Sequence, residues 1–373
     1  MKKQLKSGYT TGTCAAAATT AALELLISNR KREIIEIKSL NGIDLKVPIH
    51  SLKLGKEWAR GVVLKNSGDD PDVTNGIEIC VKVKLYKELP QIEKAHYFDN
   101  IAIVGGRGVG LVTKKGLQVP AGKSAINPGP QKMIRDAVQE IIKGTDKKVL
   151  VKVYIPQGKA KALKTFNPRL GITGGISVLG STGIVKPMSE EAWKDSLYVE
   201  LKVLKENTAR DWVIFAFGNH GKAFCESMGV DTTQMVVVSN YIGFMIDSAM
   251  EIGFKRVLLI GHIGKAIKIA GGIFNTHSRV ADGRLEILSA NAVLVDEPRE
   301  NILKILESNT VEEACQYVEK NELFRLIANK VASKSVEYSR GEIEFQSALF
   351  TFSGNLIGES DDFKKLAGDL VEK

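Results

Sequence analysis

The spacing of apolar residues changes halfway along the chain, and the first half predicts strands with few helices. Alternating apolar and polar positions recur in short segments up to residue 155, and two of these segments flank Asn41-Gly42, a strong hairpin signal. The segments that predict strands are Glu33–Lys38, Ile43–Ile49, Val62–Lys65, Ile77–Tyr86, Ile101–Val104 and Val149–Ile155.

Two stretches of the first half have helical spacing. One runs from Thr10 through the alanines at 15–18 to Ile27, with Thr11 or Thr13 as the expected N-cap. The other lies near Gln131–Lys143. Strands and helices that do not alternate regularly predict an α+β domain.

The second half alternates short apolar strands with helices. Strands are expected at Trp212–Phe217, Met235–Val238 and Val257–Ile260, and helices at Glu190–Glu206 and Tyr241–Ile252. This rhythm predicts an α/β domain with a parallel sheet between two helical layers. The pattern is mostly helical over residues 282–335, and a late strand over 342–352 fits either sheet. We place the domain boundary at Pro187-Met188-Ser189, giving domains 1–187 and 188–373.

Composition excludes several classes of protein. Of the 373 residues, 44% are hydrophobic and 25% charged, as in an ordinary soluble globular protein rather than a disordered or collagen-like one. The four cysteines are far apart and the five histidines are dispersed, so we expect neither a disulfide framework nor a protein-bound metal. The longest apolar stretches fall short of a ~20-residue membrane span, and no targeting segment is evident. We therefore expect a cytoplasmic protein without a membrane partner.

The positive charge is confined to one part of the chain. The net charge is +9, but residues 101–186 alone hold fifteen Lys or Arg and three acidic residues. This segment is also rich in Gly and Pro, so cationic side chains and bare backbone N–H groups both favour an anionic ligand. A solvated lysine surface is the alternative. Nucleic acid fits less well, because the segment has two aromatic residues, Tyr154 and Phe166, on which bases could stack.

Three strands of the second half end in small residues followed by Asn or His. The ends are Gly218-Asn219-His220-Gly221, Ser239-Asn240 and Gly261-His262-Ile263-Gly264. Ligands of parallel sheets bind outside the carboxyl ends of strands, so these residues are candidates for one binding edge. The alternative is that Asn and His only cap the helices that follow.

Two other motifs give weaker signals. The run from Gly105 to Gly110 superficially suggests a dinucleotide loop, but the next residues predict a strand and turn instead of a helix, which favours a loop where backbone approaches a ligand. Cys14 stands near a helix start, where the dipole lowers a thiol pKa. Its small neighbours indicate a close packing contact instead of a nucleophile.

Several of these stretches occur together in one family. They include Ser7-Gly8-Tyr9-Thr10-Thr11-Gly12-Thr13-Cys14 and Asn127-Pro128-Gly129-Pro130, the run from Asn167-Pro168-Arg169-Leu170-Gly171 to Gly183, and the three strand ends. The chain resembles the cobalt-precorrin-5B C1-methyltransferase (CbiD) family of anaerobic cobalamin biosynthesis from Ser7 to about Gly354. The resemblance implies that a methyl group passes from S-adenosylmethionine to C1 of a cobalt tetrapyrrole, with cobalt carried by the substrate.

The resemblance gives the candidate residues a chemical context. The substrate is an anionic polycarboxylate, so Arg107, Lys123, Arg169 and Lys265 are candidates to bind it. The strand ends provide candidates for the donor, namely Gly218, Asn219, Asn240, Gly261 and Gly264, and a ring proton leaving after methylation would need a base, for which His220 and His262 are candidates. A non-catalytic tetrapyrrole carrier and an RNA-binding protein remain as alternatives, and the oligomeric state, including a homo-oligomer, is open.

Overall fold

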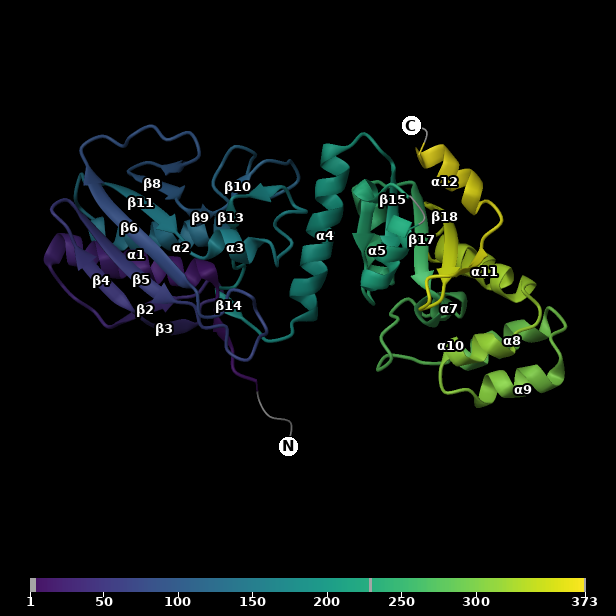
Figure 1. Cartoon of the computed structure of the whole chain (residues 1–373). Coiled ribbons are helices and arrows are strands. Elements are labelled where there is room, and N and C mark those ends of the chain that lie inside the picture. Colours follow the sequence, from purple (N-terminus) through teal and green to yellow (C-terminus); the bar gives the residue numbers. More distant parts are fainter. Residues whose placement is uncertain (1–4, 228–229, 372–373) are drawn as a thin grey trace. The chain divides into compact units, whose positions relative to one another are not determined.

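The computed structural model describes residues 5–227 and 230–371 and divides them into two units, one ending at Ala192 and one beginning at Trp193. Each unit has its own hydrophobic core. Both units combine helices with sheets, so the fold is of the mixed α/β kind (Figure 1). The division falls within helix α4 (Glu190–Asn207).

The N-terminal unit contains a six-stranded sheet in the order β4-β5-β6-β11-β8-β7. Neighbouring strands are antiparallel except for β11 and β8. The expected hairpin is confirmed as β2 (Ile34–Lys38) and β3 (Asp44–Pro48). The strands of the sheet are β4 (Ser51–Leu54), β5 (Trp58–Leu64), β6 (Glu78–Tyr86), β7 (His96–Phe98), β8 (Ile101–Gly105) and β11 (Lys148–Tyr154).

Helices α1 (Thr11–Ser28) and α2 (Pro128–Ile142) share one core with this sheet. The alanines at 15–18 are fully buried, and the lack of larger side chains lets the α1 backbone approach β5 closely. A Cβ on Gly61 would lie 2.4 Å from the carbonyl oxygen of Ala18. By length and composition α1 could cross a membrane, but its apolar residues are accounted for by this packing.

The N-cap of α1 is Thr10, and the expectation of Thr11 or Thr13 is wrong. The Thr10 side chain accepts a hydrogen bond from the backbone N–H of Thr13 at 3.2 Å. The hydroxyls of Thr11 and Thr13 donate instead to carbonyl oxygens about 170 residues further along the chain. Thr11 donates to Leu179 at 3.1 Å and Thr13 to Gly183 at 2.6 Å.

The Gly-rich segment forms short ladders and a one-turn helix instead of a dinucleotide fold. The run Gly105–Gly110 is followed by a strand, as expected. Gly108 lets two backbone segments pack closely, because a Cβ there would lie 1.8 Å from the carbonyl oxygen of Ile155; the approach of a ligand to this loop stays a prediction. The ladders pair β1 (Gly8–Tyr9) with β14 (Ile184–Val185), β9 (Gly108–Val109) with β13 (Gly175–Ile176), and β10 (Leu111–Val112) with β12 (Ile172–Thr173); the helix is α3 (Gly158–Ala162).

The C-terminal unit contains a five-stranded sheet in the order β16-β15-β17-β18-β19. The first four strands are parallel, and β19 is antiparallel to β18. The late strand, which fitted either sheet by sequence, belongs to this one. The strands are β15 (Trp212–Ala216), β16 (Met235–Val237), β17 (Arg256–His262), β18 (Glu344–Phe350) and β19 (Leu356–Glu359).

Alternate residues of these strands enter two cores, so helices pack on both faces of the sheet. Val213 and Phe215 share a core with α4, α6 (Ile242–Ile252), α7 (Ile263–Ala270) and α11 (Glu322–Tyr338). Trp212 and Ile214 share the other core with α5 (Gly218–Ser227) and α12 (Phe363–Val371). The expected helical stretch between residues 282 and 335 is confirmed, and adds α8 (Arg284–Val293), α9 (Arg299–Glu307) and α10 (Val311–Ala314) before α11. Two 3₁₀ turns, Thr232–Gln234 and Cys315–Tyr317, complete the unit.

Candidate functional site

The strand order of the C-terminal unit reverses direction between β15 and β17. The chain leaves β15 for α5 on one face of the sheet and leaves β17 for α7 on the other. Where successive connections diverge in this way, the carboxyl ends of the two strands border a crevice, and open α/β sheets bind ligands there. Two of the predicted strand ends, those with His220 and His262, lie at this position.

His262 is the last residue of β17 and the N-cap of α7. Its Nδ1 accepts a hydrogen bond from the backbone N–H of Gly264 at 3.1 Å. Since Nδ1 accepts, the ring proton of the neutral imidazole is on Nε2, which donates to Oε2 of Glu312 at 2.9 Å. The capping alternative therefore holds for His262, which is 8% exposed. Both of its ring nitrogens already have partners.

The protonation of His262 follows from its burial. Burial lowers its pKa, the hydrogen bond and charge of Glu312 oppose that shift, and the electrostatic effects of His220 and Lys265 add to it. The net pKa is below the ordinary value, so the ring is neutral at pH 7. A neutral ring is consistent with its acceptor role at the helix N-terminus.

An aromatic residue that the sequence did not single out covers His262. The ring of Phe352 stacks on His262 with centroids 3.8 Å apart, and it makes a T-shaped contact with His220 with centroids 5.5 Å apart. Glu312, on α10, also accepts a hydrogen bond from the backbone N–H of Phe352 at 3.0 Å. His220, Phe352 and Glu312 thus surround His262 at the end of β17.

The remaining donor candidates differ in how accessible they are. Gly218 has φ +67° at the start of α5, and a Cβ added there would meet nothing within 4 Å. Asn219 is exposed, and its amide has no hydrogen-bond partner among the described residues. Gly261, in contrast, makes room for the ring of Phe217, because an added Cβ would lie 2.5 Å from it.

Asn240 follows β16, on the far side of β15 from β17. It anchors the loop after α7: its side-chain oxygen accepts from the hydroxyl of Thr276 at 3.3 Å, and its carbonyl accepts from the Thr276 N–H at 3.0 Å. Asn240 therefore lies at the same edge of the sheet, but the contacts that the structure gives it are with this loop and not with the histidines. Its side chain does not cap α6.

Lys265 lies on α7, three residues after His262, and is half-buried. Burial lowers its pKa, and the nearby positive charge of Lys268 lowers it further. A lysine held in this way gains more from a bound anion than one in open solvent, because an anion restores the charge compensation that water no longer supplies. Lys265 is thus the cationic candidate beside the histidine cluster.

The basic candidates of the N-terminal unit have distinct settings. Arg107 is exposed between β8 and β9, and Arg169 is exposed with its guanidinium 5.7 Å from the ring of Phe166. Lys123 instead binds the chain itself, donating to the carbonyl oxygens of Glu93 at 2.8 Å and Ala95 at 3.1 Å. The ammonium group of Lys123 thus already has a structural role.

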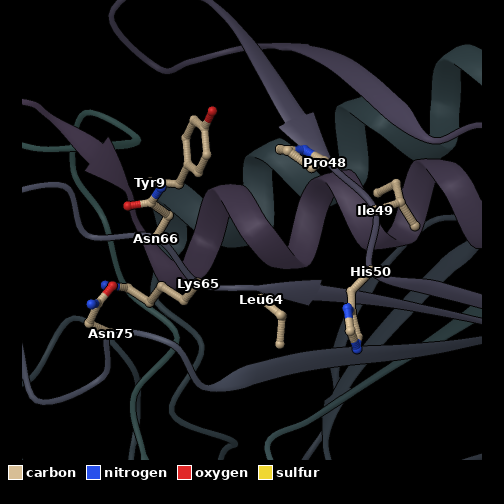
Figure 2. Close-up of a pocket in the computed structure, with 8 residues that line it drawn as sticks. All are labelled: Tyr9, Pro48, Ile49, His50, Leu64, Lys65, Asn66 and Asn75. Carbon is tan, nitrogen blue, oxygen red and sulfur yellow. The ribbon is translucent and has the colours of Figure 1, made fainter.

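The N-terminal unit also has an open cavity of about 650 Å³ (Figure 2). Its wall is partly apolar, and the predicted residues are not among those that line it. The lining residues are Tyr9, Pro48, Ile49, His50, Leu64, Lys65, Asn66 and Asn75. Cys14, on the neighbouring helix, is completely buried, and burial raises the pKa of its thiol to about 12, partly opposed by the charge of Lys65 and the helix N–H groups. The dipole argument for a reactive thiol is therefore wrong, and the packing interpretation holds.

Comparison with known proteins covers both units. The family model described as CbiD matches residues 1–187, and the model described as CbiD, C-terminal domain, matches residues 275–361. A cobalt-precorrin-5B C(1)-methyltransferase from Fusobacterium nucleatum is 57% identical over 99% of this chain and 98% of its own length. Proteins of the same name from Alkaliphilus metalliredigens and Methanocaldococcus jannaschii are 41% and 43% identical over 99% and 96% of this chain, and over 95% and 97% of their own lengths.

One solved structure also matches. It is the cobalamin biosynthesis protein (cbiD) from Archaeoglobus fulgidus, 28% identical, with 74% of this chain and 83% of that chain covered. The TM-score is 0.39.

Proposed function

The chain belongs to the CbiD family, and we propose that it transfers the methyl group of S-adenosylmethionine to C1 of cobalt-precorrin-5B, giving cobalt-precorrin-6A in anaerobic cobalamin biosynthesis. The observation that carries the proposal is the 57% identity to a cobalt-precorrin-5B C(1)-methyltransferase over 99% of the chain. This similarity extends through both units. We place the enzyme in the cytoplasm, without a membrane or nucleic-acid partner.

The donor site in this proposal is the crevice between β15 and β17, in an α/β domain over residues 188–373. The residues there fit an adenosyl donor in three respects. Gly218 leaves the backbone accessible, the side-chain amide of Asn219 is exposed without a partner among the described residues, and the side chain of Phe352 is largely exposed. Gly264 and Asn240 have supporting roles. The N–H of Gly264 binds His262, and the side-chain oxygen of Asn240 binds Thr276 in the loop after α7. Gly261 contributes packing against Phe217.

The macrocycle in this proposal is bound through its carboxylates, with the α+β domain over residues 1–187 supplying much of the positive charge. Arg107 and Arg169 are exposed on glycine-rich turns and can form bidentate pairs with carboxylates. Lys265 supplies a cation on α7. Lys123 acts indirectly, since it holds the carbonyl groups of Glu93 and Ala95. Cobalt arrives as part of the substrate.

The reaction requires little covalent help from the protein. S-adenosylmethionine supplies a methyl group on a positively charged sulfur, which an electron-rich carbon can displace. The protein's main contribution is to hold both reactants in line, an effect worth ~7–11 kcal/mol. His220 is the better candidate for the base, because it is exposed, whereas both ring nitrogens of His262 already have partners. His262 then acts by holding the end of β17 and its neighbours in place.

Titration calorimetry with S-adenosylhomocysteine tests the proposal against its two alternatives. A methyltransferase binds this demethylated donor at one site per chain. A tetrapyrrole carrier or an RNA-binding protein does not bind it. Absence of binding by the wild-type protein, with or without the macrocycle present, would refute the proposed function.

A further inference from the structure

Phe352 is held in an exposed position by contacts that a surface phenylalanine does not ordinarily have. It follows β18, the strand beside β17, and is 62% exposed. A single exposed apolar side chain needs no explanation by itself. Here, however, one face of the ring is fixed against His262, with centroids 3.8 Å apart and planes inclined by 26°, and the ring makes a T-shaped contact with His220.

Glu312 fixes both layers of this stack. One carboxylate oxygen accepts from Nε2 of His262 at 2.9 Å, and the other accepts from the backbone N–H of Phe352 at 3.0 Å. His262 is fixed from its other side by the N–H of Gly264. The phenyl ring is therefore positioned before any ligand arrives, so little conformational entropy remains to be lost when a ligand stacks on it.

We propose that Phe352, stacked on His262 and held by Glu312, is the platform on which the adenine ring of the methyl donor stacks. We call these three residues the aromatic shelf. The proposal rests on the proposed function and adds the residues that recognise the base. Glu312 is a positioning residue, since it acts through Phe352 and His262.

Adenine fits the aromatic shelf better than the macrocycle does. The shelf is one phenyl ring wide, which matches a purine, whereas a tetrapyrrole would extend far beyond it. It also lies at the strand end where α/β sheets bind nucleosides. His220, which contacts Phe352, follows directly after Gly218 and Asn219 at the start of α5, and their accessible backbone and amide suit ribose hydroxyl groups. Of the four cationic candidates for carboxylate binding, only Lys265 belongs to this unit; Arg107, Lys123 and Arg169 belong to the N-terminal unit.

The test compares Phe352→Ala, Phe352→Leu and Phe352→Trp in the full-length protein, with S-adenosylhomocysteine and with adenosine as calorimetric probes. Stacking of a base on an aromatic ring is sequence-tolerant and strong enough that its loss weakens binding of both probes by about tenfold. We expect this loss for Phe352→Ala and Phe352→Leu, and near wild-type affinity for Phe352→Trp. Leu303→Ala, which removes another exposed apolar side chain of the same unit, should leave both affinities unchanged.

Glu312 is tested by a double-mutant cycle. Glu312→Ala should weaken binding of both probes, and the double variant Glu312→Ala/Phe352→Ala should bind no more weakly than Phe352→Ala alone. A merely structural role for Glu312 would give additive losses and would overturn its assignment. Melting temperatures of all variants establish that the chain remains folded at the titration temperature.

The outcomes separate this inference from the proposed function. If the wild-type protein binds S-adenosylhomocysteine and Phe352→Ala and Phe352→Leu bind it equally well, the aromatic shelf is refuted while the methyltransferase stands. The shelf is refuted in the same way if the Phe352 variants weaken binding of the macrocycle only, or change the oligomeric state only. If the wild-type protein does not bind the donor, the proposed function itself fails.

Discussion

Lys65 and Asp72 form an ion pair in which the lysine side chain is 2% exposed and the aspartate side chain 22% exposed. The Lys65 ammonium also donates to the hydroxyl of Ser67 at 2.6 Å. Burial tends to raise the pKa of Asp72, but the charge of Lys65 and hydrogen bonds from Lys65 and Thr74 outweigh it and hold that pKa below its ordinary value. The pair fixes the loop after β5, next to the cavity of Figure 2.

Removing the carboxylate charge of this pair should lower the free energy of unfolding strongly. Asp72→Asn leaves the Lys65 charge buried without compensation, and we expect a loss of about 3–5 kcal/mol in the free energy of unfolding by urea. Lys65→Met should cost less, because Asp72 is partly exposed and keeps its hydrogen bonds from Thr74. Lys46→Met, which breaks an exposed pair with Glu36, serves as the control and should cost less than ~1 kcal/mol. Equal costs for Asp72→Asn and Lys46→Met would contradict the account.

Stability should fall on mild acidification because of His96. Its Nε2 lies 2.9 Å from the carbonyl oxygen of Ser124; burial lowers its pKa, this hydrogen bond opposes the shift, and the charge of Lys123 adds to it. The folded pKa is then below the unfolded value of about 6.5, so the unfolded chain takes up the proton first and stability decreases as pH falls below 6.5.

Urea unfolding at pH 7.5 and pH 5.5 checks this prediction. The decrease in unfolding free energy between the two values should be smaller for His96→Gln than for the wild-type protein. His50→Gln, at an exposed histidine, should leave the decrease unchanged. An identical pH dependence for wild type and His96→Gln would show that His96 does not contribute.

The contact between α1 and β5 requires a glycine at position 61. Gly61→Ala would place a Cβ 2.4 Å from the carbonyl oxygen of Ala18, so the helix must move, and we expect a cost of about 1–3 kcal/mol. Gly368→Ala on α12 is the matched control: its Cβ would meet nothing within 4 Å, and alanine should stabilise the helix by about 0.5–1 kcal/mol. Thermal and urea unfolding measure the change in stability of both variants. A neutral Gly61→Ala would mean that the helix does not approach the strand this closely.

Two arginines of the N-terminal unit should affect the macrocycle and not the donor. Arg107→Ala and Arg169→Ala each remove one charge-assisted pair, worth ~1.5–3 kcal/mol, and should raise the KM for the macrocycle. Affinity for S-adenosylhomocysteine should be unchanged. Lys164→Ala removes an exposed charge from the same segment and should alter neither quantity if specific pairing, instead of net charge, is responsible. Unchanged kinetics in both arginine variants would mean that the segment is only a solvated surface.

Local patterns predicted most helices and strands but not their long-range partners. The hairpin at Asn41-Gly42 follows from two residues, and the structure confirms it. The late strand could not be assigned, because its pairing with β17 joins residues that are distant in sequence, such as Val257 and Phe345. The N-cap of α1 was mispredicted for the same reason, since distant carbonyl groups at Leu179 and Gly183 occupy the hydroxyls of the other two threonines.

The site was predictable only where its residues end strands. His220 and His262 stand out because each comes at the end of an apolar run, and in the structure both contact the ring of Phe352 at the ends of neighbouring strands. Glu312 is 50 residues from His262 and 40 from Phe352, within a helical stretch that gives it no distinguishing pattern. Phe352 ends the late strand expected over residues 342–352, in an apolar run like those of core strands, and its exposure is visible only in the fold.

The central claim is most directly tested by methyl transfer to one carbon. The wild-type enzyme is incubated with S-adenosylmethionine labelled with ¹³C in its methyl group and with cobalt-precorrin-5B, and the product is examined by NMR spectroscopy and mass spectrometry. The account predicts one labelled methyl group per macrocycle, bonded to C1, with S-adenosylhomocysteine formed in equal amount. A label that stays on the donor, or that enters the macrocycle at another carbon, would contradict it.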